Sequence, residues 1–174
     1  MELPKRKPNR LSSYDYDREG AYFLTICTQD RKCLLSIIVG DDALGVPENR
    51  LTEIGQIVEK HILSSRNMDR ITLEKYVIMP NHIHILLTVD MNTGGTPRVS
   101  SPTTAIIPRF VASLKRFSNQ EVGKEIFQRS YHDHVIRNQQ DYLKIWEYID
   151  NNPKQWKMDC FYVKEETDVS FNRQ

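Results

Sequence analysis

Two histidines separated by one residue, His82 and His84, are the first residues in the sequence whose types and spacing point to chemistry. They stand in HIHILLTV, an apolar run that predicts a β-strand over residues 82–89. Side chains alternate across a strand, so both imidazoles should project from the same face. Two neutral imidazole nitrogens side by side make half of a metal site. Ordinary surface or capping histidines are the alternative interpretation of the same spacing.

A second pair with this spacing, His132 and His134, stands in EIFQRSYHDHVI (125–136). That segment predicts a strand, or a strand followed by a turn. By spacing alone, these two histidines compete with the first pair as metal ligands, and the residue pattern does not choose between them.

A predicted helix in the last third of the chain carries two tyrosines, Tyr142 and Tyr148. It follows Asn138, a candidate N-cap, and ends at Pro153, because proline disfavours helical geometry in the residue before it. The apolar arc of this helix, which we expect in the core, comprises Tyr142, Ile145, Trp146 and Ile149. Tyr148 lies roughly 120° from Tyr142 on the helical wheel, at the edge of that arc, where its phenol can reach a site on the sheet. A ring that simply covers the core, with its hydroxyl in water, is the alternative.

The other segments predict the elements that position these residues. Short runs rich in aromatic and β-branched residues predict strands at 21–28, 71–79 and 82–89, the last two separated by Pro80 and Asn81. Apolar residues at three-and-four spacing predict helices within 51–62 and 106–117. The connections are short and suit antiparallel pairing, and no Gly-rich phosphate loop follows a strand. The sequence therefore predicts an α+β fold, with helices packed on one face of an antiparallel sheet.

The composition is that of one folded domain. The chain has 174 residues, of which 39% are hydrophobic and 27% charged, as in an ordinary globular protein. We therefore expect a single domain over 1–174. Residues 90–105 (DMNTGGTPRVSSPTTA) are rich in Gly, Ser, Thr and Pro, which predicts a mobile loop within that domain.

The net charge gives no general attraction to nucleic acid, because 24 Lys and Arg balance 23 Asp and Glu, for a formal charge of +1. Contacts with phosphates would have to come from local basic clusters, for which solvated surface charge is the alternative explanation. The clusters consist of Lys5, Arg6, Lys7 and Arg10 near the amino terminus and of Arg109, Lys115 and Arg116 in the second predicted helix.

The cysteines and the hydropathy pattern predict a cytoplasmic protein. Three cysteines without C-x-x-C spacing indicate neither a disulfide framework nor a zinc knuckle. The polar start lacks the apolar region of a secretory leader, and no run approaches the roughly 18 apolar residues of a membrane span.

Three segments together resemble one family, the REP-associated tyrosine transposases. The segments are YVIMPNHIHILL (76–87), FQRSYHDHVIRN (127–138) and DYLKIWEYIDNNP (141–153), and the resemblance runs in order from about Tyr22 to Trp156. It implies a ferredoxin-like fold, an HUH metal pair and one nucleophilic tyrosine, as in the related transposases of single-strand insertion sequences.

Carried onto this chain, the family pattern assigns the site residues. The HUH pair matches His82 and His84, with apolar Ile83 at the U position. The family's tyrosine directly precedes I-x-x-N-P, which matches Tyr148, and its amide-bearing metal ligand four residues later matches Asn152. The second H-x-H pair is then expected to be structural or to contact DNA.

The resemblance also implies the chemistry. Mg²⁺ or Mn²⁺ would polarise a scissile phosphate, and Tyr148 would attack it to form a 5′-phosphotyrosyl linkage and a free 3′-hydroxyl. The expected partner is single-stranded DNA with hairpins or palindromic repeats, and both a monomer and a homodimer occur among such proteins.

Two other function classes are compatible with the same residues. One is a domesticated DNA-binding module that recognises hairpins without cutting them. The other is a metal-dependent hydrolase that uses a water nucleophile in place of the phenol, and it would leave no covalent adduct with DNA.

Overall fold

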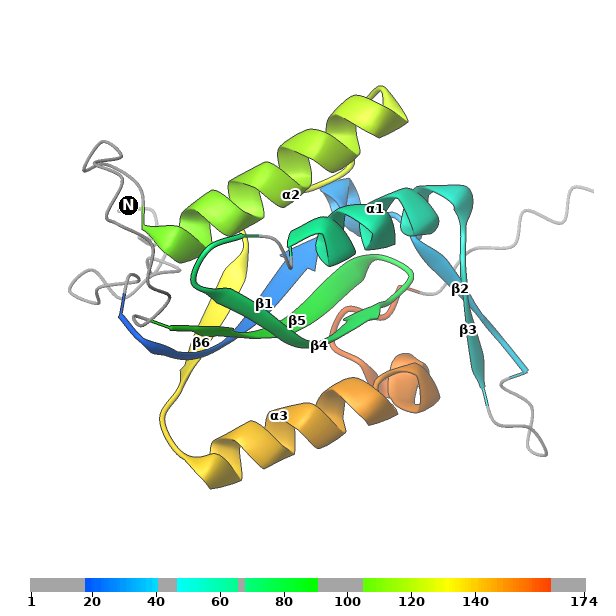
Figure 1. The fold of residues 1–174 in the computed structure, drawn as a ribbon. Helices are drawn as coiled ribbons and strands as arrows, with labels where there is room; N and C mark the ends of the chain where they lie inside the picture. Colours follow the sequence, from blue (N-terminus) through cyan, green and yellow to red (C-terminus); the bar gives the residue numbers. More distant parts are fainter. Residues whose placement is uncertain (1–17, 41–46, 66–67, 91–104, 164–174) are drawn as a thin grey trace, which may run out of the picture.

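The computed structural model of the chain describes residues 18–40, 47–65, 68–90 and 105–163 (Figure 1). The predicted loop at 90–105 and the amino-terminal basic cluster of Lys5, Arg6, Lys7 and Arg10 lie largely or wholly outside these residues.

A four-stranded antiparallel sheet forms the centre of the structure, with the strand order β4-β5-β1-β6. Its strands are β1 (Gly20–Cys27), β4 (Ile71–Ile78), β5 (His82–Val89) and β6 (His132–Ile136). Each predicted strand is confirmed, although in the segment 125–136 only the last five residues join the sheet. The turn between Ile78 and His82 makes β4 and β5 a hairpin.

A separate two-stranded ribbon, β2 (Ser36–Val39) with β3 (Glu48–Leu51), extends from one end of the sheet (Figure 1). Nothing in the sequence predicted it. Both strands have only four residues, and β3 reads Glu, Asn, Arg, Leu, a polar run without the aromatic and β-branched enrichment that marks a strand.

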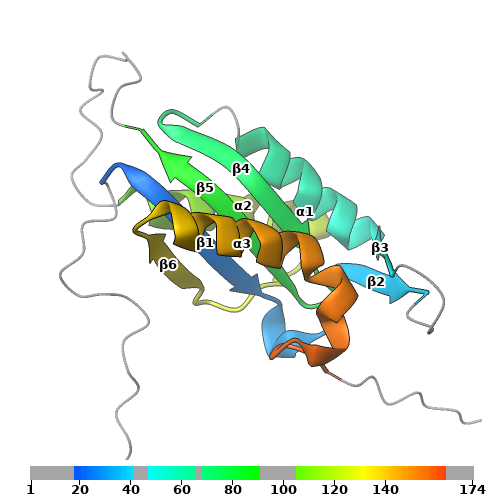
Figure 2. The ribbon, with the colours of Figure 1, turned by 90° about the horizontal axis from the view of Figure 1, so that it is seen from below.

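Two helices cover one face of the sheet and a third crosses the other (Figures 1 and 2). The first face holds α1 (Glu53–Ser64) and α2 (Ile106–Val122), as the sequence predicted. The third helix, α3 (Gln139–Asn151), lies across the opposite face and is followed by the 3-10 helix η3 (Pro153–Met158). The expected α+β fold with an antiparallel sheet is thus confirmed, and α1 and α2 share one face as predicted. The position of α3 on the opposite face differs from the expectation of helices on one face, because α3 packs on the side of the sheet that carries His82 and His84.

The main core lies between the sheet and the helices α1 and α2. Tyr22, Leu24 and Ile26 of β1 are fully buried there, as are Phe110 and Leu114 of α2. The residues between them in β1 face the other way, toward α3, because side chains alternate along a strand. The two faces of β1 therefore differ: one packs into the core against α1 and α2, and the other faces α3.

The helix α3 begins and ends as the sequence predicted, but its apolar arc is not core throughout. The side-chain oxygen of Asn138 accepts a hydrogen bond from the backbone N–H of Asp141, which confirms the N-cap. Of the four arc residues only Ile149 is fully buried, whereas Trp146 remains 36% exposed and Tyr142 is half-buried. A single helix on one face of a sheet has no second helix to cover its flanks, which explains the difference.

Candidate active site and metal centre

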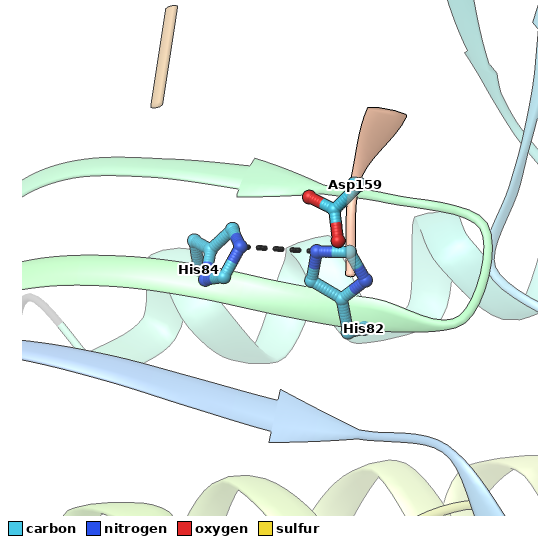
Figure 3. Close-up of side chains that lie close together, drawn as sticks. All are labelled: His82, His84 and Asp159. Atoms are coloured by element: carbon cyan, nitrogen blue, oxygen red, sulfur yellow. Dashed lines mark hydrogen bonds between the residues drawn. The ribbon is translucent and has the colours of Figure 1, made fainter. Parts of the chain in front are cut away.

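His82 and His84 lie side by side on the face of β5 that α3 covers, as their spacing predicted (Figure 3). Their Nε2 atoms are 3.0 Å apart, and both side chains are buried. The strand geometry places the two rings edge to face, with centroids 4.5 Å apart, and the buried setting keeps water from competing for their nitrogens.

The Nδ1 atoms of both histidines form hydrogen bonds with neighbouring polar side chains. Nδ1 of His82 lies 2.9 Å from Oδ1 of Asn81, and Nδ1 of His84 lies 2.9 Å from Oγ1 of Thr25, its partner across β1. The Asn81 amide nitrogen donates to the carbonyls of Arg31 and Phe161, which directs its oxygen toward His82. An amide oxygen can only accept, so Nδ1 of His82 carries the proton and Nε2 keeps its lone pair.

Both imidazoles are neutral at physiological pH. Burial, together with the nearby Arg31 guanidinium, lowers the pKa of His82 to about 3. Burial and the neighbouring His82 lower the pKa of His84 well below its usual value, although Asp159 acts in the opposite direction. A neutral imidazole with a free lone pair is the form that binds a metal ion.

The carboxylate of Asp159 joins the histidine pair from the turn that follows η3 (Figure 3). One ligand atom from each of the three residues lies within 4.8 Å of the others, which makes a group that could hold a metal ion. Oδ1 of Asp159 accepts a hydrogen bond from the backbone N–H of Phe161 at 2.7 Å. The sequence reasoning missed this residue, because it stands in an irregular segment where no periodicity indicates which way a side chain points.

Asn152, the expected third ligand, lies next to Asp159 at the end of α3. It is buried, and its amide nitrogen donates to Oδ2 of Asp159 at 3.0 Å. Its Oδ1 atom is buried without a hydrogen-bond partner among the described residues. A buried carbonyl oxygen with no donor is a group that a hard divalent cation can satisfy.

The Tyr148 hydroxyl reaches the same place from α3. It lies 3.3 Å from Nε2 of His84 and 3.3 Å from Oδ2 of Asp159. Its ring packs edge-on against Phe23, which in turn stacks on His84 with ring centroids 5.0 Å apart. Burial first, and then the Asp159 carboxylate, raise the pKa of Tyr148 to about 12. The phenol is therefore protonated at rest, yet the side chain remains 38% exposed.

The competing tyrosine and the second histidine pair lie elsewhere. Tyr142 stacks on Trp146 instead of reaching the histidines. His132 and His134 are exposed on β6, and Nε2 of His134 lies 2.8 Å from Oδ2 of Asp141. Within the described ranges, the metal-capable group of three includes the first pair only.

The basic residues of α2 lie on the face of the sheet opposite to α3 (Figure 1). The Lys115 ammonium donates to the carbonyls of Gln128, Arg129 and Ser130 at 2.7, 3.2 and 2.9 Å. Arg109 and Arg116 are exposed, and the Arg116 guanidinium lies 4.6 Å from the ring centroid of Phe117. Only the two arginines therefore present their charge to solvent. No helix among the described residues is long and apolar enough to cross a membrane.

Comparisons with known proteins agree on one family. Residues 48–152, more than half of the chain, match the model of the IS200-like transposases. An uncharacterized protein of Haemophilus influenzae is 31% identical over 91% of this chain and 93% of its own length. A second protein of that bacterium, named as a candidate REP-associated tyrosine transposase, is 26% identical over 82% of this chain and 76% of its own length.

Among solved structures, the fold is similar to that of a REP-associated tyrosine transposase bound to a REP hairpin. The TM-score is 0.56 at 21% identity, and the match covers 88% of this chain and 73% of the other. At this identity, the likeness concerns the fold.

Proposed function

Because the chain belongs to the IS200-like transposase family, we propose that it cuts and rejoins single-stranded DNA at short hairpins, with the Tyr148 hydroxyl as the nucleophile. The family match also confirms the resemblance to REP-associated tyrosine transposases. The observation that carries the proposal is the position of this hydroxyl, 3.3 Å from both His84 Nε2 and Asp159 Oδ2. A phenol beside two neutral imidazoles and a carboxylate suits nucleophilic attack on a phosphate, at a place where the same groups would hold a divalent metal ion.

The residues at this site fit a divalent metal ion. His82 and His84 would supply their Nε2 atoms, and Asp159 a carboxylate oxygen. The buried Oδ1 of Asn152 is available as a further oxygen ligand. When bound, Mg²⁺ or Mn²⁺ would offset the charge that develops on the scissile phosphate. Imidazole ligands favour Mn²⁺ in affinity, whereas carboxylate and amide oxygens suit both ions.

The protein's own groups would orient the nucleophile and accept its proton. Tyr148 donates a hydrogen bond to Oδ2 of Asp159, so that carboxylate is placed to take the proton as the oxygen attacks phosphorus. The new bond joins the Tyr148 oxygen to phosphorus, and the bond to the 3′-oxygen breaks. That oxygen takes a proton from water and leaves as a free 3′-hydroxyl, while Asp159 returns the tyrosine's proton to solvent. The phosphotyrosyl bond keeps the energy of the phosphodiester, so a 3′-hydroxyl can reverse the step without ATP.

A DNA hairpin is the proposed partner. The solved structure with the similar fold holds a REP hairpin, and both sequence relatives cover most of this chain. Arg109 and Arg116 remain proposed contacts to the DNA backbone, together with Lys5, Arg6, Lys7 and Arg10 outside the described residues. Arg109 and Arg116 belong to α2, on the face of the sheet opposite to α3, so they would contact the duplex stem while the single strand enters the site beside Tyr148.

The decisive experiment compares the parent protein with Tyr148→Phe, which deletes one oxygen and keeps the ring. Both are incubated with Mn²⁺ and 3′-labelled oligonucleotides that carry a hairpin with single-stranded flanks. The parent should form a labelled, denaturant-resistant adduct, and Tyr148→Phe should bind the same DNA without forming it. Tyr142→Phe is the matched control and should keep the adduct. Cleavage without an adduct would indicate a water nucleophile, and binding without cleavage a domesticated binding module.

A further inference from the structure

The edge strand β4 contains a β-bulge that changes which residues face α3. The pairing with β5 shifts between Leu73 and Lys75, so that Leu73 pairs with Leu87 and Lys75 with Leu86. Beyond the bulge, Tyr76 faces α1, where its hydroxyl donates to Glu59 at 2.9 Å. Two successive residues, Glu74 and Lys75, are thus turned toward α3 where a regular strand would place only one.

Lys75 makes two contacts with α3. Its ammonium lies 4.0 Å from the ring centroid of Trp146 and 2.6 Å from Oδ2 of Asp150. The Lys75 side chain is only 18% exposed, although its partners lie at the protein surface. Trp146 and Asp150 are one helical turn apart and stand two residues on either side of Tyr148, so the lysine holds the flank of the helix that is turned away from that tyrosine.

Glu74 lies near Tyr142, which precedes Trp146 by one turn of α3. Its carboxylate accepts a hydrogen bond from the Thr88 hydroxyl at 2.9 Å. Burial, and then the neighbouring Glu74 carboxylate, raise the pKa of Tyr142. Tyr142, Trp146 and Asp150 recur every four residues, so the bulge faces one continuous stripe of the helix.

These contacts matter because apolar burial holds α3 weakly. Ile149 is the one residue of the helix that is fully buried. A helix seated on so few apolar side chains can roll about its axis unless a flank is held. Tyr148 and Trp146 lie on opposite flanks, since two residues correspond to about 200° of rotation. A roll that releases Trp146 would therefore move the Tyr148 hydroxyl relative to the histidines.

We propose that Lys75 is a positioning residue for the reaction, because it fixes the rotation of α3 that places the Tyr148 hydroxyl beside His84. The bulge at Glu74 is the device that turns Lys75 toward the helix. The functional part of this inference rests on the proposed role of Tyr148, whereas the structural part, the docking of α3, can be measured without DNA.

The test compares Lys75→Met, which keeps an apolar stem but removes the charge, with Lys75→Arg, which keeps a cation. Lys144→Met is the matched control, because Lys144 is exposed on the same helix and the change in charge is identical. Asp150→Asn removes the ion pair but leaves the Trp146 contact, and it serves if Lys75→Met does not fold. For each variant, three quantities are measured: the rate of adduct formation at saturating hairpin DNA, the Kd for that DNA, and deuterium uptake by the amides of α3.

Lys75→Met should slow adduct formation about tenfold at saturating DNA, as the loss of a cation–π contact and an ion pair would. Its Kd should stay within about twofold of the parent value, because a positioning contact does not touch DNA. Deuterium uptake in α3 should become faster, Lys75→Arg should restore both properties, and Lys144→Met should resemble the parent.

A parent-like rate and uptake in Lys75→Met would overturn the proposal. A weaker Kd with an unchanged saturated rate would also overturn it, because Lys75 would then be a phosphate contact. If the parent forms no adduct with any hairpin, the proposed function fails instead. In that case, faster uptake in Lys75→Met but not in Lys144→Met would still support the docking role, and equal uptake would refute it.

Discussion

The Tyr148 hydroxyl lies 3.3 Å from Nε2 of His84, although the two residues are 64 positions apart in the chain. That nitrogen is also the atom that faces His82, at 3.0 Å. The proposed nucleophile and the candidate metal ligands therefore lie next to one another, between β5 and α3. Any change that moves the helix relative to the strand should alter metal binding and tyrosine reactivity together.

Metal binding should depend on the first histidine pair and not on the second. Calorimetry with Mn²⁺ should show binding by the parent and loss of binding in His82→Ala and in His84→Ala. His134→Ala is the control and should bind like the parent. Asp159→Ala and Asn152→Ala should each weaken binding, and Asp159→Ala more strongly, because a carboxylate adds charge as well as an oxygen. Full affinity in His82→Ala would move the site elsewhere.

The metal-free protein should lose stability as the pH falls below 6.5. The pKa of His82 is about 3 in the folded chain, and that of His84 is also lowered, whereas an unfolded histidine has a pKa of 6.5. Within this window the unfolded chain binds more protons, so the free energy of unfolding rises with pH and falls with acid. With a folded pKa of about 3, His82 alone should cost about 2 kcal/mol between pH 7 and pH 5, and His84 acts in the same direction.

Urea unfolding in the presence of a chelator measures this effect. His84→Asn removes one titrating group, so its stability should change less between the two pH values. An equal change in the variant and the parent would mean that acid acts through other groups.

Two neighbouring basic residues of α2 should behave differently. Arg116→Ala should weaken hairpin binding and reduce the slope of log K against log salt by about one, as expected for a lost phosphate contact. Lys115→Met should instead lower thermal stability, because the carbonyls of Gln128, Arg129 and Ser130 lose a shared donor. Titrations at several salt concentrations, with melting curves for both variants, check this. A normal melting temperature with weaker binding in Lys115→Met would contradict the prediction.

Gly55→Ala should destabilise the fold. A Cβ at this position in α1 would lie 1.9 Å from the backbone oxygen of Leu35. That oxygen already accepts a hydrogen bond from the backbone N–H of Thr52, the N-cap of α1, so the segment around Leu35 cannot shift without breaking this bond. We expect a loss of about 1–3 kcal/mol in the free energy of unfolding. Gln56→Ala, an exposed neighbour in the same helix, is the control for changes in helix propensity.

The parts of the fold with a regular period could be predicted from the sequence. The alternation of a strand places His82 and His84 on one face, and the wheel of α3 places Tyr148 at the border of its buried side. The family pattern supplied the choice of His82 and His84 over His132 and His134, which spacing alone left open.

The rest depends on features that have no period. Asp159 reaches the histidines from a turn whose backbone follows tertiary contacts, so nothing in its spacing marks it. Regular alternation after Leu73 would turn Lys75 toward α1, but the bulge at Glu74 turns it toward α3. Only the pairing of β4 with β5 reveals the bulge. Trp146 belongs to the apolar arc of the wheel, which predicted a core position, but the Lys75 ammonium lies over one side of its ring.

The order in which the site residues occur along the chain has a consequence for biosynthesis. His82 and His84 belong to a hairpin that is complete at residue 89, whereas Tyr148 and Asp159 follow the last strand of the sheet. When residues 1–136 have emerged from the ribosome, the nascent chain contains the histidine pair and all strands of the four-stranded sheet, but not Tyr148. On the proposed chemistry, such a nascent chain cannot become covalently joined to DNA. By the same proposal, covalent reactivity begins only when α3 has emerged and docked on a sheet that is already formed.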